Sequence, residues 1–283
     1  MRLSSTSLKF NTFIRVKSLM KHIVRKLFLK MRTEIKNQLP MVIVNDRIGT
    51  SIVFNGFYEI DIVNAIMSSL DFDPHKNTCL DIGANIGNHS VQFSNYFKKV
   101  IAFEPQLRIF KILKLNAEPY DSISVNNYGL SSKNEEVLIH IPYGNSGGAS
   151  HVITQPENKN NYYSEQIHLR VYDDEFDENI SFAKIDVEGN ELEVIKGMKN
   201  NIQKYKPVIS FEYSYTEKDG VLDILKELGY ERFFVPKSPF LNKLFRSGNL
   251  YPIKSLYEVD LPVKKNYSLV TTFHKDSAFK IKT

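Results

Sequence analysis

The stretch that decides the fold is Thr78-Cys79-Leu80-Asp81-Ile82-Gly83-Ala84-Asn85-Ile86-Gly87. Its first half reads as a buried strand, and its second half as a tight turn into a helix. Glycines let the backbone approach a ligand closely, and the start of a helix offers free N–H donors. A dinucleotide fingerprint would read G-x-G-x-x-G, but Asn85 replaces the middle glycine, which argues against a pyrophosphate. Asp81 instead suits the cationic end of a ligand.

A second acidic residue, Glu104, ends the next apolar run at 100–103 and lies 23 positions after Asp81. A carboxylate at the end of the second strand of such a sheet can accept hydrogen bonds from both hydroxyls of a ribose. A surface glutamate before Pro105 is the alternative. The joint spacing of the turn and Glu104 favours nucleoside binding.

Strand-like and helix-like runs alternate through most of the chain. Strands are expected at 78–82, 100–103, 123–126, 137–141, 182–187, 208–212, 233–235 and 269–273, and helices at 60–70, 88–96, 106–117, 191–202 and 219–228. This alternation predicts a doubly wound α/β fold, with a parallel sheet covered by helices on both faces. Short apolar runs at 41–44 and 51–54 predict a small hairpin before it, and the polar segments 144–161 and 236–249 are typical of lids.

The chain is expected to have three parts: a basic head at 1–39, a lead-in at 40–76 and the main domain at 77–283. Ten Lys and Arg stand against Glu34 within residues 1–36, a net charge of +9. The whole chain carries +5, which leaves −4 for the remainder. Apolar residues of the head recur every three or four positions, as on one face of a helix: Phe13, Val16, Met20, Val24, Leu27 and Met31.

Charges interrupt every apolar run of the head, so it is not expected to span a bilayer or to act as a signal peptide. It can lie on an anionic membrane surface, or pack on the domain or on a second subunit. Nucleic acid is not an expected partner, because the rest of the chain adds no basic surface. Composition is typical of a folded soluble protein, and Cys79 is the only cysteine. A cytoplasmic protein, peripheral on the membrane if the head binds lipid, is therefore expected.

Acidic residues also follow two later strands. Asp186 and Glu188 end the run at 182–187, and Glu212 ends the run at 208–212. If the extended geometry persists, Asp186 and Glu188 point to the same side. Three carboxylates are then expected to converge above the sheet, while Glu191 places a charge in the first turn of the next helix.

These motifs together resemble the FkbM family of methyltransferases. The resemblance rests on the strings DIGANIGNHS, FEP, NYGLSS, GGASH, KIDVEGNELEVIKG and PVISFEY, and it extends over residues 42–230 with a similar lead-in at 57–59. The head and the part after Pro236 lie outside it. The resemblance implies a class I fold of seven strands, the last antiparallel, and methyl transfer from S-adenosylmethionine to a hydroxyl oxygen of an acceptor such as a sugar, a polyketide or a glycan.

The resemblance also implies roles for individual residues. The methionine end of the cofactor is expected at Asp81, Gly83, Asn85, Gly87 and Asn88. The ribose is expected at Glu104, and the adenine near Leu130 and Ser131. The acceptor is expected to face Asp186, Glu188 and Glu212.

The base that deprotonates the acceptor stays open at this point. A sugar hydroxyl is about as weak an acid as water, with a pKa near ~15.7, whereas Asp titrates near ~3.9, so a lone carboxylate is a feeble base. Deprotonation can come late in the transfer, a histidine can assist, or a divalent cation such as Mg²⁺ can acidify the hydroxyl. His151, in the polar segment, is a better base candidate than His89. Asp186 and Glu212 suit a hard cation.

The sequence leaves three other functions to consider. Gly144–Gly148 fits G-x-S-x-G, but a hydrolase needs a helix after it, and the polar stretch with Pro156 predicts none. Asp71-Phe72-Asp73 formally fits the D-x-D of a glycosyltransferase, although Pro74 favours a turn there. A non-catalytic membrane adaptor is the remaining alternative, and the acidic residues after both of the first two strands argue against it.

Overall fold

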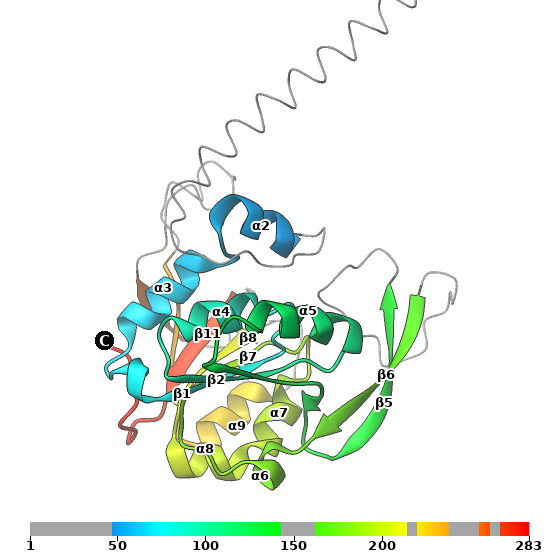
Figure 1. Ribbon diagram of the computed structural model, residues 1–283. Coiled ribbons are helices and arrows are strands. Elements are labelled where there is room, and N and C mark those ends of the chain that lie inside the picture. The colour runs from blue at the N-terminus through cyan, green and yellow to red at the C-terminus, as the bar shows by residue number, and fades with distance from the viewer. Residues whose placement is uncertain (1–46, 143–161, 214–219, 238–254, 261–266, 283) are drawn as a thin grey trace, which may run out of the picture.

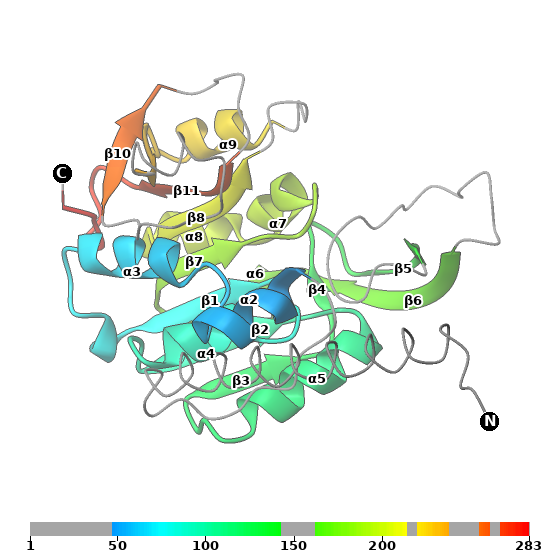
Figure 2. The ribbon, with the colours of Figure 1, turned by 90° about the horizontal axis from the view of Figure 1, so that it is seen from above.

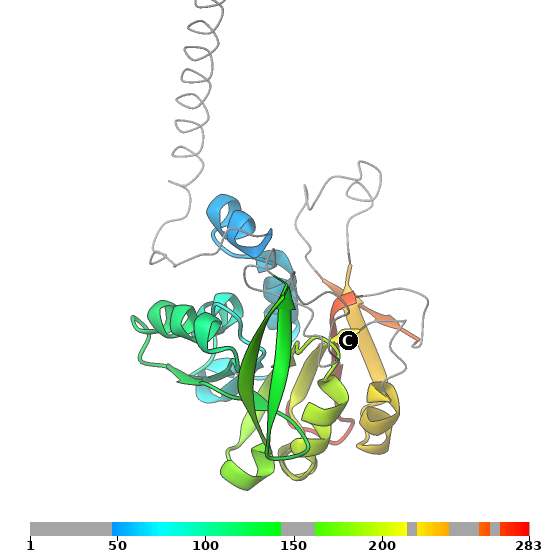
Figure 3. The ribbon, with the colours of Figure 1, turned by 90° about the vertical axis from the view of Figure 1, so that its right-hand side faces the viewer.

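The computed structural model describes residues 47–142, 162–213, 220–237, 255–260 and 267–282. They form an α/β domain in which one large sheet is covered by helices on both faces, as the sequence predicts (Figure 1). A second, three-stranded sheet stands at one side of the domain (Figure 3).

The large sheet has the strand order β10-β9-β11-β8-β7-β1-β2-β3. Its parallel part consists of β1 (Thr78–Ile82), β2 (Lys99–Phe103), β3 (Ile123–Asn126), β7 (Ile180–Ile185) and β8 (Val208–Tyr213). The strand β11 (Tyr267–Phe273) runs antiparallel between β8 and β9 (Arg232–Pro236). The seven strands from β9 to β3 therefore match the predicted arrangement with an antiparallel last strand. At the edge, β10 (Leu256–Val259) adds an eighth strand that the sequence did not reveal.

Helices pack on both faces of the sheet (Figures 1 and 2). One face carries α3 (Ile60–Ser69), α4 (Asn88–Ser94) and α5 (Leu107–Ala117), and the other carries α6 (Tyr172–Glu175), α7 (Glu191–Gly197), α8 (Lys199–Tyr205) and α9 (Val221–Glu227). The single helix expected at 191–202 is divided at Met198. Gly197 lies so close to the backbone of Ser131 that a Cβ there would come 2.0 Å from its carbonyl oxygen.

Alternation along the strands divides the core between the two faces. Leu80 and Ile82 of β1 belong to the cluster under α7 and α9, whereas Cys79 packs with Phe93 and Phe182 under α3 and α4. Both faces of β1 are buried, which explains why its sequence is an almost continuous apolar run. This double burial holds the C-terminal end of β1 in place, and the glycine turn starts from that end.

Several local expectations were wrong. Residues 51–54 are not a hairpin strand but part of helix α2 (Arg47–Asn55), because Ile52 packs on Ile86 and Ile109; residues 41–44 lie outside the described part. On α5, Leu107 and Leu115 are 49% and 55% exposed, whereas Ile109 and Leu113 face the sheet and are buried.

The second sheet extends the strand expected at 137–141. Strand β5 (Glu135–Pro142) pairs antiparallel with β6 (Tyr162–Arg170), and β6 also pairs with the short β4 (Gly129–Leu130). Strand β6 escaped prediction because three polar residues in a row, Ser164, Glu165 and Gln166, interrupt its apolar residues, and only Ile167 of the strand is buried. The two strands form an arm that projects from the domain (Figures 1 and 2). The segments 144–161 and 236–249, expected to be lids, lie outside the described part except for Pro236 and Lys237.

Candidate active site

The glycine turn lies between the ends of β1, β2 and β7. The backbone N–H groups of Gly83 and Ala84 both donate to the carbonyl oxygen of Phe103, at 3.1 and 2.9 Å. Gly83 has a φ of 75°, and a Cβ there would lie 1.9 Å from the carbonyl oxygen of Asp186, so only glycine fits. Asn85 has a φ of 51°, a conformation that asparagine tolerates better than most residues. The residue that replaces the dinucleotide glycine thus keeps the backbone geometry of a glycine.

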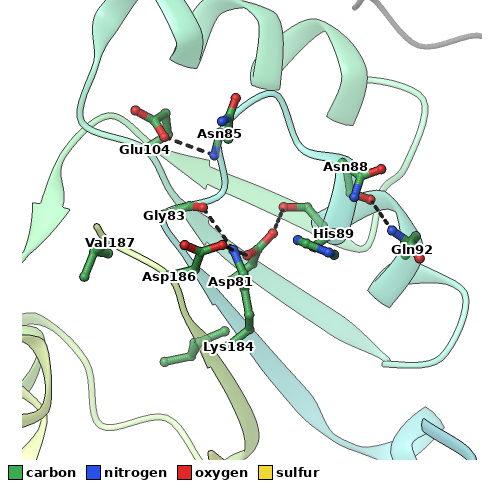
Figure 4. Close-up of polar contacts among 12 residues, drawn as sticks. Asp81, Gly83, Asn85, Asn88, His89, Gln92, Glu104, Lys184, Asp186 and Val187 are labelled. Carbon is green, nitrogen blue, oxygen red and sulfur yellow. Dashed lines mark hydrogen bonds and ion pairs between the residues drawn. The ribbon is translucent and has the colours of Figure 1, made fainter. Parts of the chain in front are cut away.

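Glu104 follows β2 and lies directly beside this turn (Figure 4). Only 5% of the residue is exposed. Its Oε2 accepts from the N–H of Asn85 at 3.0 Å, and its Oε1 accepts from the N–H of Gln106 at 2.9 Å. Burial raises its pKa to about 7, although these hydrogen bonds act in the opposite direction. Each carboxylate oxygen can still accept another donor, so the residue fits a ligand with two neighbouring hydroxyls.

A buried charge cluster stands behind the turn. Lys184 of β7 is the direct neighbour of Asp81 across the parallel pair, and its side chain is 2% exposed. Its Nζ lies 3.5 Å from Asp81 Oδ1 and 3.1 Å from Asp186 Oδ2, and it donates to the carbonyl oxygen of Gly83 at 3.2 Å (Figure 4). Burial by itself lowers the pKa of Lys184, but Asp186 and Asp81 outweigh burial and the pKa is raised. Lys184 is therefore a charged ammonium that ties β1, the turn and β7 together.

Asp81 is completely buried, and its second oxygen accepts from Ser90 Oγ at 2.6 Å. Its carboxylate acts on the turn through Lys184. Sequence reasoning singled out Asp81 but missed Lys184, although a lysine inside the apolar strand 180–185 is the signal that could have revealed it.

The three carboxylates expected above the sheet do converge. Candidate ligand oxygens of Asp186, Glu188 and Glu212 all lie within 4.8 Å of one another. The assumed extended geometry was wrong, because Glu188 has a φ of 56° and Gly189 a φ of 96°. The turn is closed by Glu191, whose Oε1 accepts from the N–H of Val187 at 3.0 Å. Glu188 therefore lies near Asp186 because of this left-handed turn, and not because side chains alternate along an extended strand.

The first turn of α4 binds the lead-in. Asn88 accepts from the N–H of Tyr58 at 2.9 Å and donates to its carbonyl oxygen at 3.1 Å, and Gln92 donates to the same oxygen at 2.9 Å. His89 Nε2 lies 3.6 Å from Glu59 Oε2. The Asn88 side chain, expected at the cofactor, is thus engaged in holding Tyr58, and Gly87 begins the helix with a φ of 88°. Sequence reasoning noted 57–59 only as a similar lead-in, and missed these contacts.

Leu130 and Ser131 lie further along the same edge. Both are buried, and the N–H of Ser131 donates to the carbonyl oxygen of Arg170 at 2.9 Å. A Cβ at Gly129 would lie 3.5 Å from the ring of Pro105, the residue after Glu104, which is ordinary van der Waals contact. This segment therefore passes next to Glu104.

Other candidate residues lie elsewhere. His151, the basic head and the G-x-S-x-G segment 144–148 are outside the described part of the chain. Asp73 accepts from the N–H of His75 at 3.1 Å at the start of the 3-10 helix η1 (Pro74–Lys76). This turn precedes β1, at the edge of the sheet opposite the glycine turn, so Asp71 and Asp73 do not join the site.

Two features place the molecule in class I of the S-adenosylmethionine-dependent methyltransferases: the antiparallel strand β11 between β8 and β9, and the glycine turn with the acidic residue Glu104 beside it at the end of β2. Within that class, the chain belongs to the FkbM family: the family model described as "Methyltransferase FkbM domain" matches residues 81–232.

The chain is also similar to individual known proteins. The hexuronic acid methyltransferase AglP of Haloferax volcanii is 27% identical over 175 residues, which cover 60% of this chain and 68% of the relative. A ribosomal RNA small subunit methyltransferase A of Staphylococcus aureus is 30% identical over 89 residues, which are 31% of this chain and 30% of that enzyme. The crystal structure of an FkbM methyltransferase from Methylobacillus flagellatus aligns at 17% identity with a TM-score of 0.43, over 71% of this chain and 44% of the other.

Proposed function

We propose that this methyltransferase moves a methyl group from S-adenosylmethionine to a hydroxyl oxygen of a sugar or glycan, free or lipid-linked. The observation that carries the proposal is the convergence of three carboxylates beside the glycine turn. Carboxylates that accept hydrogen bonds from several hydroxyls at once are well suited to hold a carbohydrate. The similarity to a hexuronic acid methyltransferase supports the same acceptor class.

The cofactor would lie along the C-terminal edge of β1 and β2. Glu104 would accept both ribose hydroxyls, with the adenine toward Leu130 and Ser131. The methionine end would lie over Gly83, Asn85 and Gly87. Asp81 and Asn88 would act there indirectly, since Asp81 holds Lys184 and Asn88 holds Tyr58.

S-adenosylmethionine, when bound, supplies a methyl group already activated by its sulfonium. The protein then has to align the acceptor oxygen and exclude water. Asp186, Glu188 and Glu212 would fix the acceptor through its hydroxyls, and His151 would assist in removing the proton. Lys184 holds the Asp186 carboxylate in place by an ion pair of 3.1 Å.

Calorimetric titration with S-adenosylmethionine and S-adenosylhomocysteine tests the cofactor, and transfer of a labelled methyl group to a panel of hexoses, hexuronic acids and lipid-linked glycans tests the acceptor. Micromolar binding and transfer to one sugar class are expected. Absence of binding by folded protein would contradict the proposal and leave a methyltransferase-like adaptor. Transfer only to an acceptor without sugar hydroxyls would contradict the acceptor class.

A divalent cation is proposed at Asp186 and Glu212, with Glu188 as the third oxygen donor. Hard cations bind such carboxylate sets, and the oxygens lie close enough to share one ion. EDTA is then expected to lower the methyl-transfer rate about tenfold or more, because the bound cation would acidify the acceptor hydroxyl. Added Mg²⁺ is expected to restore the rate.

The matching variants are Asp186→Asn and, as a control on an exposed helix surface, Asp223→Asn. Asp186→Asn is expected to lose both the rate and the response to Mg²⁺, while Asp223→Asn keeps both. Equal rates with and without EDTA would show that the carboxylates act without a cation.

The basic head is proposed to hold the enzyme on an anionic membrane surface. Among the described residues, the structure contains no helix long and apolar enough to cross a membrane. Deletion of residues 1–36, which carry +9, is expected to abolish sedimentation with phosphatidylglycerol vesicles at low salt. Vesicle binding that persists in the deletion variant would contradict the proposal, and a changed oligomeric state without vesicle binding would indicate packing on a second subunit.

A further inference from the structure

The outer surface of helix α5 combines exposed leucines with cations. Its exposed residues recur at positions 107, 108, 111, 114 and 115, which at roughly 100° per residue lie within an arc of about 120° on one side of the helix. Leu107 and Leu115 are 49% and 55% exposed, and they are two of the four exposed large apolar side chains in the described part of the chain. The three exposed residues between them are basic: Arg108, Lys111 and Lys114. We call this surface the α5 stripe.

No acidic residue belongs to the α5 stripe. Helix α5 contains no Asp or Glu, and the neighbouring carboxylates of Glu118 and Glu165 lie at its two ends. None of the salt bridges among the described residues engages the three cations of the stripe. Within that part of the chain, these cations are therefore available to an external anionic partner.

The two helical layers of the domain differ in charge. The layer of α2 to α5 holds four Lys and Arg against a single acidic residue, Asp61. The opposite layer, α6 to α9, holds four Lys against seven Asp and Glu. Without residues 1–36 the chain has a net charge of −4, so the basic layer differs in sign from the rest of the chain. A molecule polarised in this way turns the layer of α2 to α5 toward an anionic surface.

The basic head joins the domain on this same side. Ile52 of α2 packs with Ile86 and with Ile109 of α5, and Figures 1 and 2 show α2 on the side of the sheet that carries α4 and α5. Only residues 37–46 separate α2 from the segment 1–36 with its charge of +9, and a chain of this length spans at most about 35 Å. A head bound to a membrane would therefore keep the α5 stripe within reach of the same surface.

We propose that the α5 stripe is a second docking surface for an anionic membrane, in which the two leucines enter the headgroup region and the three cations contact lipid phosphates. The proposal extends the membrane contact proposed for the head and does not depend on the methyl-transfer reaction. Helical faces with cations beside apolar residues lie on anionic interfaces in this way. Because α5 begins at Leu107, three residues after Glu104, this docking brings the edge of the sheet that carries the candidate site near the lipid.

The charges of the α5 stripe disfavour its other possible occupants. The head carries +9 itself, and a second copy that docked through the same stripe would set three cations against three. The phosphates of a nucleic acid would pair with the cations but would leave Leu107 and Leu115 without an apolar partner. An anionic bilayer offers phosphates and an apolar region together.

The first test uses fluorescence. The chain contains no tryptophan, so Leu115→Trp in the full-length protein places a single reporter on the α5 stripe. On vesicles of phosphatidylglycerol and phosphatidylcholine in equal parts, its emission is expected to shift to shorter wavelength and to be quenched by brominated lipid chains. Tyr257→Trp is the matched control, because Tyr257 is 39% exposed on β10, at the edge of the sheet opposite to β3, on which α5 packs. Its emission is expected to stay unchanged in vesicle-bound protein.

The second test removes the cations. Changing all three cations of the α5 stripe to Gln, a good helix former, is expected to lower the vesicle partition coefficient about a hundredfold, since each cation near an anionic surface contributes about fivefold. The control variant changes the net charge equally on the exposed surface of α8 and α9: Lys199→Gln, Lys204→Gln and Lys226→Gln. Its partition coefficient is expected to stay within about threefold of the wild type.

Several outcomes would overturn the proposal. Emission of Leu115→Trp that neither shifts nor is quenched in vesicle-bound protein would leave the head as the membrane contact without the α5 stripe. Equal losses in the two triple variants would show that net charge alone decides. Tighter binding of the wild type to duplex DNA than to vesicles would assign the stripe to nucleic acid, and a wild-type dimer that the Gln variant strengthens would assign it to a second copy. A wild type that does not bind these vesicles would overturn both membrane proposals and leave the methyl-transfer proposal untouched.

Discussion

Replacing Glu104 with alanine is expected to weaken the binding of S-adenosylmethionine and S-adenosylhomocysteine by about a hundredfold to ten-thousandfold. Two hydroxyl donors to one carboxylate make two charge-assisted hydrogen bonds, each contributing about 1.5–3 kcal/mol. The loss is larger than for an exposed carboxylate, because Glu104 is 5% exposed and water competes poorly there. Titration calorimetry at pH 8 measures the affinity directly.

The variant is expected to remain folded, so the lost affinity can be separated from unfolding. The Glu104 pKa is raised from 4.5 to about 7, so that above pH 7 the ionised side chain destabilises the folded protein by about 3 kcal/mol. Its removal relieves that cost and offsets the lost acceptor for the N–H groups of Asn85 and Gln106. A melting temperature within a few degrees of the wild type is the required observation.

Glu165→Ala is the matched control. This carboxylate also accepts a backbone N–H at the same edge of the sheet, from Leu107 at 2.6 Å, but in an exposed position. Its loss is expected to leave cofactor affinity within about threefold of the wild type, since exposed contacts of this kind are worth little. Unchanged affinity in Glu104→Ala would remove the ribose assignment, and with it the main argument for where the nucleoside lies.

The parts of the fold that the sequence predicts are those in which burial leaves an unambiguous pattern. Strands β1, β2, β7 and β8 are buried on both faces and read as apolar runs, so their order and direction followed from the alternation with helices. Strand β6 is the middle strand of the small sheet, but Ser164, Glu165 and Gln166 follow one another in it and only Ile167 is buried, so a single sequence gives no clear strand pattern there. Strand β10 is only four residues long and lies at the edge of the large sheet. Helix α2 was mistaken for a strand because one turn of it, 51–54, is mostly apolar.

The candidate site also has parts that the sequence predicts and parts that it does not. The convergence of Asp186 and Glu212 was predictable because parallel neighbouring strands end at one edge. The left-handed turn at Glu188 was not, because it depends on the turn that Gly189 and Glu191 form together. The contact of the lead-in with α4 was beyond sequence reasoning for a different reason: it joins Tyr58 to Asn88, 30 residues later in the chain.

Lys184 connects the predicted and the unpredicted parts. It is bonded to Asp81 and Asp186 and donates to Gly83, so the first strand, the glycine turn and the acceptor-side carboxylates share one buried cation. A buried charge without such partners would be strongly destabilising. The carboxylates of the motif therefore have a structural role toward Lys184 in addition to the role proposed for them toward ligands.

Cofactor affinity is expected to rise about tenfold per pH unit between pH 5 and pH 7 and to level off above pH 7. In the free protein, burial keeps Glu104 protonated up to about pH 7. Two ribose hydroxyls donate to the ionised carboxylate and so favour that form, which lowers the pKa of Glu104 in the complex. Binding below pH 7 must therefore release a proton, and the total gain from pH 5 to pH 7 is about a hundredfold.

Stability of the free protein is expected to change in the opposite direction. Between pH 4.5 and pH 7 the folded protein holds a proton on Glu104 that the unfolded chain has lost, so the contribution of this group to stability falls as the pH rises.

Calorimetry at pH 6 in two buffers of different ionisation enthalpy measures the number of protons released on cofactor binding. This number should approach one at pH 6 and zero at pH 8. Glu104→Gln, which has no proton to lose, should bind weakly and with the same affinity from pH 5 to pH 8. An affinity of the wild type that stays flat or falls over this range would show that the carboxylate does not ionise to receive the ribose.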